Sequence, residues 1–127
     1  MEPRVLSSDI TIGNKTYRLN KCDARTACWM FSFLGAKIEK EGGSIFGAIG
    51  KCTRVEFDEI QTIALKHTFF IDNKDGNEFP IAIIAANGTW IDKELGENSS
   101  ALMKLTSEYL GFVIKPFLVE SGLNSQI

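Results

Sequence analysis

Apolar and polar residues alternate near the start of the chain, and apolar residues then recur with a helical period. The segments 10–12 and 15–19 alternate and are rich in β-branched and aromatic residues, which predicts two strands. Gly13 and Asn14 between them tolerate the positive φ of a tight turn. Asp23 can then cap a helix over 24–39. We therefore expect a β-hairpin followed by a helix.

The helical period returns twice further along the chain. Thr53 and Glu56 have the spacing of a capping box, which predicts a helix over 54–68. A longer helix is expected from Ser99 or Ser100 onward, and Pro116 should kink it because proline removes a backbone donor. Its apolar positions at helical spacing are Leu102, Leu105, Tyr109, Phe112 and Val113.

A second hairpin is predicted between these two helices. Asp75-Gly76 is a strong turn signal, and the flanking segments 69–74 and 77–84 have strand character. Pro80 lacks a backbone N–H, so its strand should lie at the edge of a sheet.

Together these patterns predict an α+β fold that is mainly helical. We expect an N-terminal β-hairpin, about three to four helices, and a second short hairpin before the long C-terminal helix. The length of 127 residues suits a single domain over 1–127 with enough core to fold without metals or disulfides. The ends at 1–8 and 123–127 are expected to be mobile.

Charge and hydropathy narrow the possible partners. The chain has 14 basic and 16 acidic residues, and its basic residues form no stripe that could neutralise many phosphates. Nucleic acid is therefore not an expected partner. The longest nearly unbroken apolar run, 80–86, is far shorter than the roughly 20 residues that cross a bilayer. We expect no membrane association and a location in the cytoplasm.

Candidate chemistry is sparse. Cys22, Cys28 and Cys52 have neither the count of a disulfide framework nor the spacing of a zinc site, and His67 is the only histidine. The glycine-rich connector 42–52 lacks the spacing of a phosphate-binding loop. Cys28 lies beyond the strongest field of its helix N-terminus, so we expect a buried structural thiol. We predict no catalytic residue, no metal and no cofactor.

The end of the last helix is a candidate surface for a partner or for self-association. Tyr109, Phe112, Phe117 and Leu118 lie on both sides of Pro116, and part of their apolar area can remain exposed for a partner. The alternative is that these side chains complete the core, which aromatic residues at helical spacing usually do.

Two longer patterns, one after the first hairpin and one in the last helix, identify a family resemblance. They are Leu19-x-Lys21-x-Asp23-Ala24-Arg25-Thr26-x-x-Trp29 and Leu102-x-x-Leu105-Thr106-x-Glu108-x-Leu110-x-Phe112, the second followed by Pro116-Phe117. Over about 10–122 the chain resembles the tail assembly chaperones of long-tailed, siphovirus-type bacteriophages and prophages.

The resemblance implies a non-catalytic role. Such a chaperone binds the tape-measure protein in the host cytoplasm, keeps it soluble, helps recruit tail-tube protein during tail morphogenesis, and is absent from the mature virion. Homo-oligomers are implied as well. The structural signature would be Asp23 as a cap, Arg25 as a polar contact, and Trp29 as an anchor between the hairpin and the helix. Two alternatives stay open: a structural tail component (a tube or tail-completion protein), or a small cytosolic enzyme that uses Cys28 or His67.

Overall fold

The strands of the chain form one four-stranded antiparallel sheet. The computed structural model describes the backbone of residues 6–121 and the side chains of residues 6–117. The strands are β1 (Ser7–Ile12), β2 (Lys15–Asn20), β3 (Thr68–Lys74) and β4 (Asn77–Ala82), and they lie in the order β1-β2-β3-β4. Both predicted hairpins are present. The α+β expectation is therefore confirmed.

The two hairpins are joined by a pairing that the local pattern did not predict. Strand β2 pairs antiparallel with β3, with Leu19 opposite Thr68 and Tyr17 opposite Phe70. At the outer edge of the sheet, β1 begins at Ser7, so the expectation of a mobile start over 1–8 is wrong at its last two positions. Ser7 and Ser8 belong to the ladder because they pair with residues at the end of β2.

The hairpin turns and the edge position of Pro80 agree with the predictions from the sequence. Gly13, Asp75 and Gly76 have positive φ angles of 65°, 52° and 80°, as tight hairpin turns require. Pro80 lies in β4, which is an edge strand, so its missing N–H interrupts no internal ladder.

The next helices are α1 (Ala24–Lys40), α2 (Ile45–Ile49) and α3 (Arg54–Lys66), and α1 and α3 follow the predicted capping signals. Asp23 accepts a hydrogen bond from the Thr26 backbone N–H at the start of α1. Thr53 and Glu56 form both halves of a capping box before α3. This helix ends at Lys66 and not at the expected Thr68, which is instead the first residue of β3.

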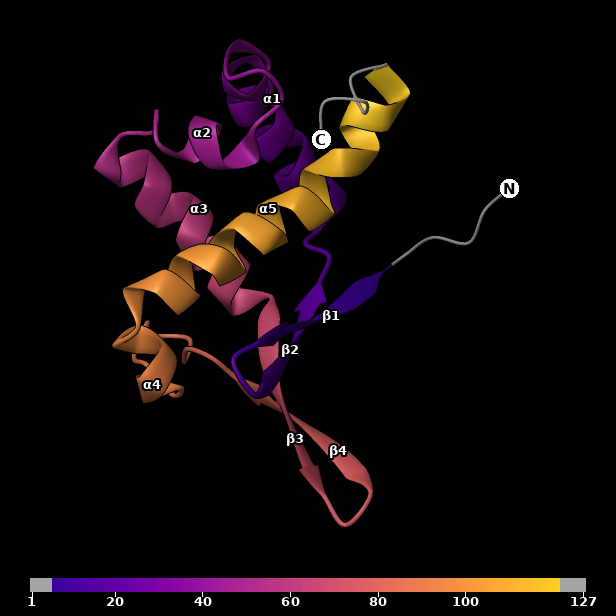
Figure 1. Cartoon of the computed structure of the whole chain (residues 1–127), viewed down its shortest axis with the longest axis vertical. Helices are drawn as coiled ribbons and strands as arrows, with labels where there is room; N and C mark the ends of the chain where they lie inside the picture. Colours follow the sequence, from indigo (N-terminus) through magenta and orange to yellow (C-terminus); the bar gives the residue numbers. More distant parts are fainter. Residues whose placement is uncertain (1–5, 122–127) are drawn as a thin grey trace.

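The last third of the chain contains α4 (Lys93–Gly96) and α5 (Ser99–Ser121). The short α4 was not predicted, although Asp92 caps it by accepting from the Leu95 backbone N–H. The long α5 continues through Pro116. In Figure 1, α5 runs diagonally across the molecule, α1 and α2 lie near its C-terminal half, and α4 lies at its start.

The main core is formed between α1, α2, α3, β2 and α5. Its buried members include Leu19, Met30, Leu34, Ile38, Ile60, Tyr109, Leu110 and Ile114. A second cluster of Tyr17, Leu65, Ile83, Leu95 and Leu105 lies around the start of α5. The β3–β4 hairpin extends away from the helices (Figure 1), and β4 is exposed along nearly its whole length. The core therefore holds α5 against the β1–β2 hairpin and leaves the tip of the β3–β4 hairpin free of it.

Candidate functional site

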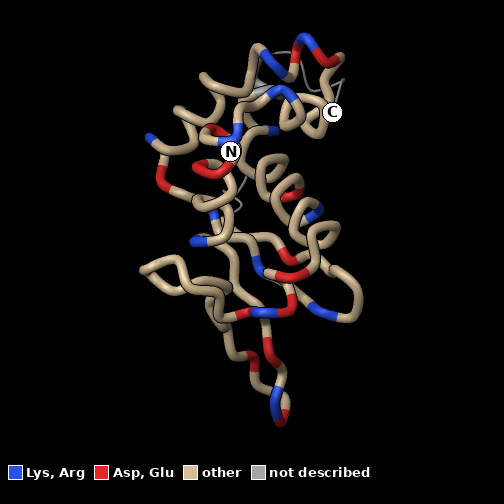
Figure 2. Tube along the Cα trace, turned by 90° about the vertical axis from the view of Figure 1, so that its left-hand side faces the viewer, with Lys and Arg blue, Asp and Glu red and all other residues tan. Residues whose placement is uncertain are grey.

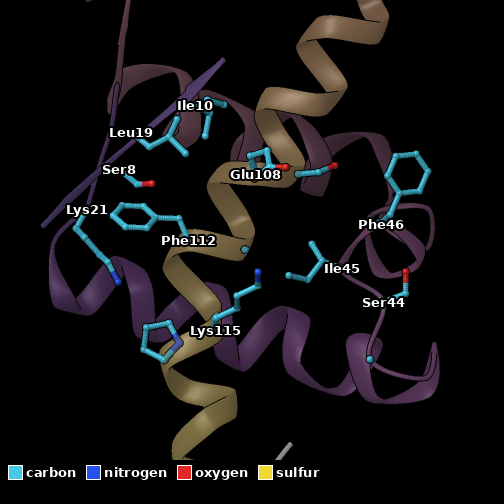
Figure 3. A pocket seen from close by; sticks show the side chains of 14 residues that line it. Ser8, Ile10, Leu19, Lys21, Ser44, Ile45, Phe46, Glu108, Phe112 and Lys115 are labelled. Carbon is cyan, nitrogen blue, oxygen red and sulfur yellow. The ribbon is translucent and has the colours of Figure 1, made fainter. Parts of the chain in front are cut away.

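A groove runs along one side of α5, and the core residue Leu19 is part of its lining. Its volume is about 750 Å³. The first hairpin forms one wall, the segment around α2 forms the other, and α5 forms the floor. The lining residues are Ser8, Ile10, Leu19, Lys21, Gly43, Ser44, Ile45, Phe46, Ser107, Glu108, Gly111, Phe112, Lys115 and Pro116. Figure 3 shows the labelled members of the two walls on either side of α5.

The floor follows from the helical period of α5. Ser107, Gly111 and Lys115 are spaced by four residues, which places them on one side of the helix. Gly111 has no side chain, so the groove reaches close to the helix backbone at this point. A Cβ atom added to Gly111 would lie 3.5 Å from Ile45 Cδ1 and 3.8 Å from Lys115 Cε, both ordinary van der Waals contacts. Gly111 is buried, and the floor at this position has space for a methyl group between these two side chains.

One wall carries an aromatic ring that is already partly covered. The Phe112 ring is half-buried and lies 4.6 Å from Lys21 Nζ, a cation–π distance. The lysine comes from the end of the first hairpin, where its backbone N–H donates to the Leu6 carbonyl at 3.0 Å. The contact therefore ties the hairpin end to α5 and places a positive charge beside an apolar surface.

The opposite wall carries exposed apolar surface. Ser44 caps α2 by accepting from the Gly47 backbone N–H at 2.9 Å, and this short helix presents Ile45 and Phe46 to the groove. Phe46 is 64% exposed, and Leu6, next to the other wall, is 61% exposed. Large apolar side chains rimmed by polar residues often mark a protein-interaction surface.

A buried hydroxyl group also lines the groove. The Oγ of Ser107 is buried and has no hydrogen-bond partner among the described residues. Most buried polar side-chain atoms in folded proteins do have a partner. The Ser107 hydroxyl is therefore an exception among the buried polar atoms of the described residues.

The hairpin wall is held by a charged pair on its outer side. Arg18 Nε donates to Asp9 Oδ1 at 2.7 Å and Arg18 Nη2 donates to Asp9 Oδ2 at 2.9 Å. The hydrogen bond from Arg18 lowers the pKa of the Asp9 carboxyl below its usual value of 3.8. This two-bond contact between β1 and β2 helps to keep the edge strand next to α5.

The structure divides the predicted partner surface. Tyr109 is fully buried, and its hydroxyl donates to the Asn20 carbonyl at 2.9 Å, so its assignment to a surface is wrong. The position lies on the core side of α5. Phe112 lines the groove, and Phe117 is half-buried and stacks on Phe31 with 4.9 Å between ring centroids. The side chain of Leu118 lies outside the described residues.

The signature residues occupy the first helix and lie outside the groove lining. Asp23 is the helix cap, as expected, and hydrogen bonds from Thr26 lower its pKa below the usual range. Arg25 is exposed. The Trp29 ring stacks on Phe33 of the same helix with 5.7 Å between centroids. Its aromatic partner is thus on α1 itself, one turn away, and not on the hairpin.

The candidate nucleophile Cys28 and the candidate base His67 form no hydrogen bond with each other in the described part of the chain. Cys28 is exposed, so the expected burial is wrong, because its position on α1 faces away from the buried Met30 and Leu34. The Nδ1 of His67 lies 2.8 Å from the Ile63 carbonyl. This contact occupies that nitrogen at the C-terminal end of α3. Burial raises the pKa of the Cys52 thiol and disfavours its thiolate.

Two further properties concern only the part of the chain that the structure describes. Within residues 6–121, no three side chains among His, Cys, Asp and Glu come together as metal ligands. No helix in that range combines the length and apolar character needed to cross a membrane.

Comparisons with known proteins identify no relative. No protein-family model matches the chain, and no curated protein or solved structure matches it either.

Most of the groove was not foreseen from the sequence. The one signal for its α2 wall is Ser44 followed by two large apolar residues inside a glycine-rich connector, a pattern that resembles a capped helical turn. The hairpin wall carries no separate signal, because Ser8 and Lys21 gain their place only through the packing of β1 and β2 on α5.

Proposed function

We propose that this protein is a tail assembly chaperone of a long-tailed bacteriophage or prophage. It would bind the tape-measure protein, keep it soluble in the host cytoplasm, and help recruit tail-tube protein. The proposal draws on the family resemblance of the two residue patterns in 19–29 and 102–117. It describes a binding protein with no catalytic step.

The observation that carries the proposal is the apolar groove along α5. Its walls present Ile10, Ile45 and Phe112, and Phe46 remains largely exposed beside them. A long helical protein without its tube exposes apolar stripes that would otherwise aggregate. Helix-in-groove binding covers such a stripe with a small protein, and many copies along one tape-measure chain would cover its length.

The test is coexpression with the tape-measure protein of the same phage or prophage, identified as the very long helical protein encoded beside the tail genes. We expect the tape-measure protein to become soluble and to co-purify with this chain. If its solubility does not rise and the two proteins do not co-purify, the proposal is wrong. Finding this chain in purified virions would instead favour a structural tail component.

Two exposed phenylalanines provide a matched pair of variants. Phe46→Ser removes apolar surface from the groove wall, whereas Phe79→Ser makes the same change on the exposed strand β4, where Phe79 is 48% exposed. Neither variant should alter folding, because neither side chain is buried. We expect Phe46→Ser to reduce co-purification and Phe79→Ser to leave it unchanged. Equal losses would place the contact surface elsewhere.

A further inference from the structure

The two edges of the sheet are built differently. The order β1-β2-β3-β4 makes β1 and β4 the edge strands. An edge strand has a row of N–H and C=O groups without sheet partners, and a strand from another chain can pair with this row. In an antiparallel pair, hydrogen-bonded and non-hydrogen-bonded positions alternate along each strand. The register therefore determines which backbone groups face outward on each edge.

The outer edge of β4 is interrupted at its centre. Asn77 and Lys74 flank the two-residue turn, so they form a hydrogen-bonded pair. By alternation, Phe79 and Ile81 also direct their backbone groups toward β3. Pro80 lies between these two residues, so its nitrogen faces outward and has no hydrogen to donate. A strand added to β4 would lack a central hydrogen bond, and this edge therefore resists pairing.

The outer edge of β1 contains no proline. The Lys21 backbone N–H donates to the Leu6 carbonyl at 3.0 Å, which marks a hydrogen-bonded pair of the β1–β2 ladder. By alternation, Ser7, Asp9 and Thr11 are the positions whose N–H and C=O groups point away from β2. All three residues are exposed, and no backbone group elsewhere in residues 6–121 bonds to them. This edge is therefore able to accept a strand.

The charge on β1 is already compensated. A charged side chain often protects an edge strand from pairing, and Asp9 is the one charged residue of β1. Its carboxylate accepts two hydrogen bonds from the Arg18 guanidinium, at 2.7 and 2.9 Å. Figure 2 shows basic and acidic residues interspersed along the chain, and the net charge of −2 is small. Charge therefore opposes the approach of a second copy only weakly.

An exposed apolar side chain lies at the start of this edge. Leu6 is 61% exposed. Because side chains alternate along a strand, it lies on the same face of the sheet as Ser8 and Ile10. Ile10 is half-buried on that face. An added strand that brought an apolar residue opposite Leu6 would remove its side chain from water.

We propose that β1 pairs antiparallel with β1 of a second copy, about a two-fold axis at Ser8, so that the two sheets become continuous. Ser7 and Asp9 of one copy would exchange N–H···O=C hydrogen bonds with Asp9 and Ser7 of the other. Leu6 would lie opposite Ile10 of the second copy, and the symmetry makes this contact twice. The inference goes beyond the proposed function, because it needs no tape-measure protein.

Charge and apolar contact select this register. A two-fold axis at Asp9 would place two aspartates directly opposite each other, and like charges at such positions are destabilising. An axis at Ile10 would bring Leu6 opposite the turn at 13–14 and leave it uncovered. An axis at Ser8 covers Leu6 with Ile10 and opposes no like charges.

The first test is sedimentation velocity of the full-length protein over a dilution series. We expect a reversible equilibrium between one chain and two. Ser7→Pro removes an outward N–H, as Pro80 does on β4, and the dimer loses one hydrogen bond from each copy. The dissociation constant should rise about tenfold. Ser7→Ala keeps the N–H and should leave the constant unchanged. A wild type that stays monomeric at every concentration would overturn the proposal, and so would equal constants for the two variants.

The second test is disulfide trapping, which also reports the register. In a background with Cys28→Ser, which removes the exposed thiol, Ser8→Cys should cross-link rapidly with diamide. Its two Cα atoms would lie about 4.5 Å apart across the axis. Ser7→Cys is the matched control, because its two copies would be diagonal neighbours about 7–8 Å apart. Equal rates of cross-linking for the two cysteines would contradict an axis at Ser8.

A strand from another protein is the competing occupant of this edge. Hydrogen exchange at the Ser7 and Asp9 amides separates the two cases without any substitution. In the protein alone, exchange should slow as concentration rises. If it stays fast at every concentration and slows only in a complex with the tape-measure protein, the edge binds a strand of that protein and the proposed dimer is wrong.

The two proposals fail in different ways. If the chain stays monomeric but makes the tape-measure protein soluble, the chaperone function stands and the dimer is wrong. If the Ser8→Cys dimer forms but the tape-measure protein is neither solubilised nor co-purified, the dimer stands and the proposed function is wrong.

Discussion

The two sides of α5 differ in the burial of their side chains. On one side the side chains are buried, as Leu105, Tyr109 and Val113 show. On the other side Glu108 and Lys115 are exposed, and Gly111 has no side chain at all. One helix therefore stabilises the fold with one face and provides the floor of a groove with the other. Variants on the two faces should have separable effects on stability and on binding.

The largest expected effect comes from a cavity on the core side. Leu110 is fully buried in the main core, so Leu110→Ala should lower the free energy of unfolding by about 2–5 kcal/mol. Urea denaturation followed by circular dichroism would measure this loss. Phe46→Ala is the control on the groove side, and it should change stability by less than about 0.5 kcal/mol. Similar losses of stability in the two variants would contradict the assignment of one face of α5 to the core and the other to the groove.

A smaller loss of stability is expected when a hydrogen bond on the core side of α5 is removed. Tyr109→Phe removes the hydrogen bond from the hydroxyl to the Asn20 carbonyl, 2.9 Å long, and keeps the ring. The free energy of unfolding should fall by about 1 kcal/mol. The same denaturation experiment measures the change. A variant as stable as the wild type would show that this hydrogen bond contributes no net stability.

The raised pKa of Tyr109 predicts how the free energy of unfolding changes at alkaline pH. Burial raises the pKa of Tyr109 above its usual value of 10.0, and burial also raises that of Tyr17. Because the folded pKa lies above the unfolded one, this contribution is complete below pH 10 and is lost as pH rises through the folded pKa.

Urea midpoints measured from pH 8 upward would show the decline. It should be shallower in Tyr109→Phe and shallower still in the double variant with Tyr17→Phe. A decline of the same slope in all three proteins would mean that other groups cause it.

The smallest expected effect is a gain of stability on the groove side. Gly111→Ala should stabilise α5 by about 0.5–1 kcal/mol, because glycine is a poor residue in a helix interior. The new Cβ would lie 3.5 Å from Ile45 Cδ1, so it has space.

Gly96→Ala is the matched control for this gain. Its Cβ would come within 2.8 Å of Trp90 Cδ2, so this variant should lose stability. Thermal denaturation of both variants would detect the opposite signs. A loss of stability in Gly111→Ala would show that the floor of the groove is already filled.

The local features of the fold were predictable because they depend on near neighbours. Asp23 and Thr53 cap their helices through backbone groups three residues away, and Asp75-Gly76 turns a hairpin through its own φ angles. The failures have a different origin. Cys28 is exposed and Tyr109 is buried, and both outcomes depend on which face of a helix meets the rest of the protein.

Both hairpins, the three longer helices and the caps at Asp23 and Thr53 follow from the sequence, since these interactions connect residues that are close along the chain. The pairing of β2 with β3, and the placement of Lys21 from the hairpin and Ile45 from α2 along one groove on α5, depend on the packing of distant segments. A groove forms where packed elements leave space between them. No single segment encodes that space, because its walls come from parts of the chain that are far apart.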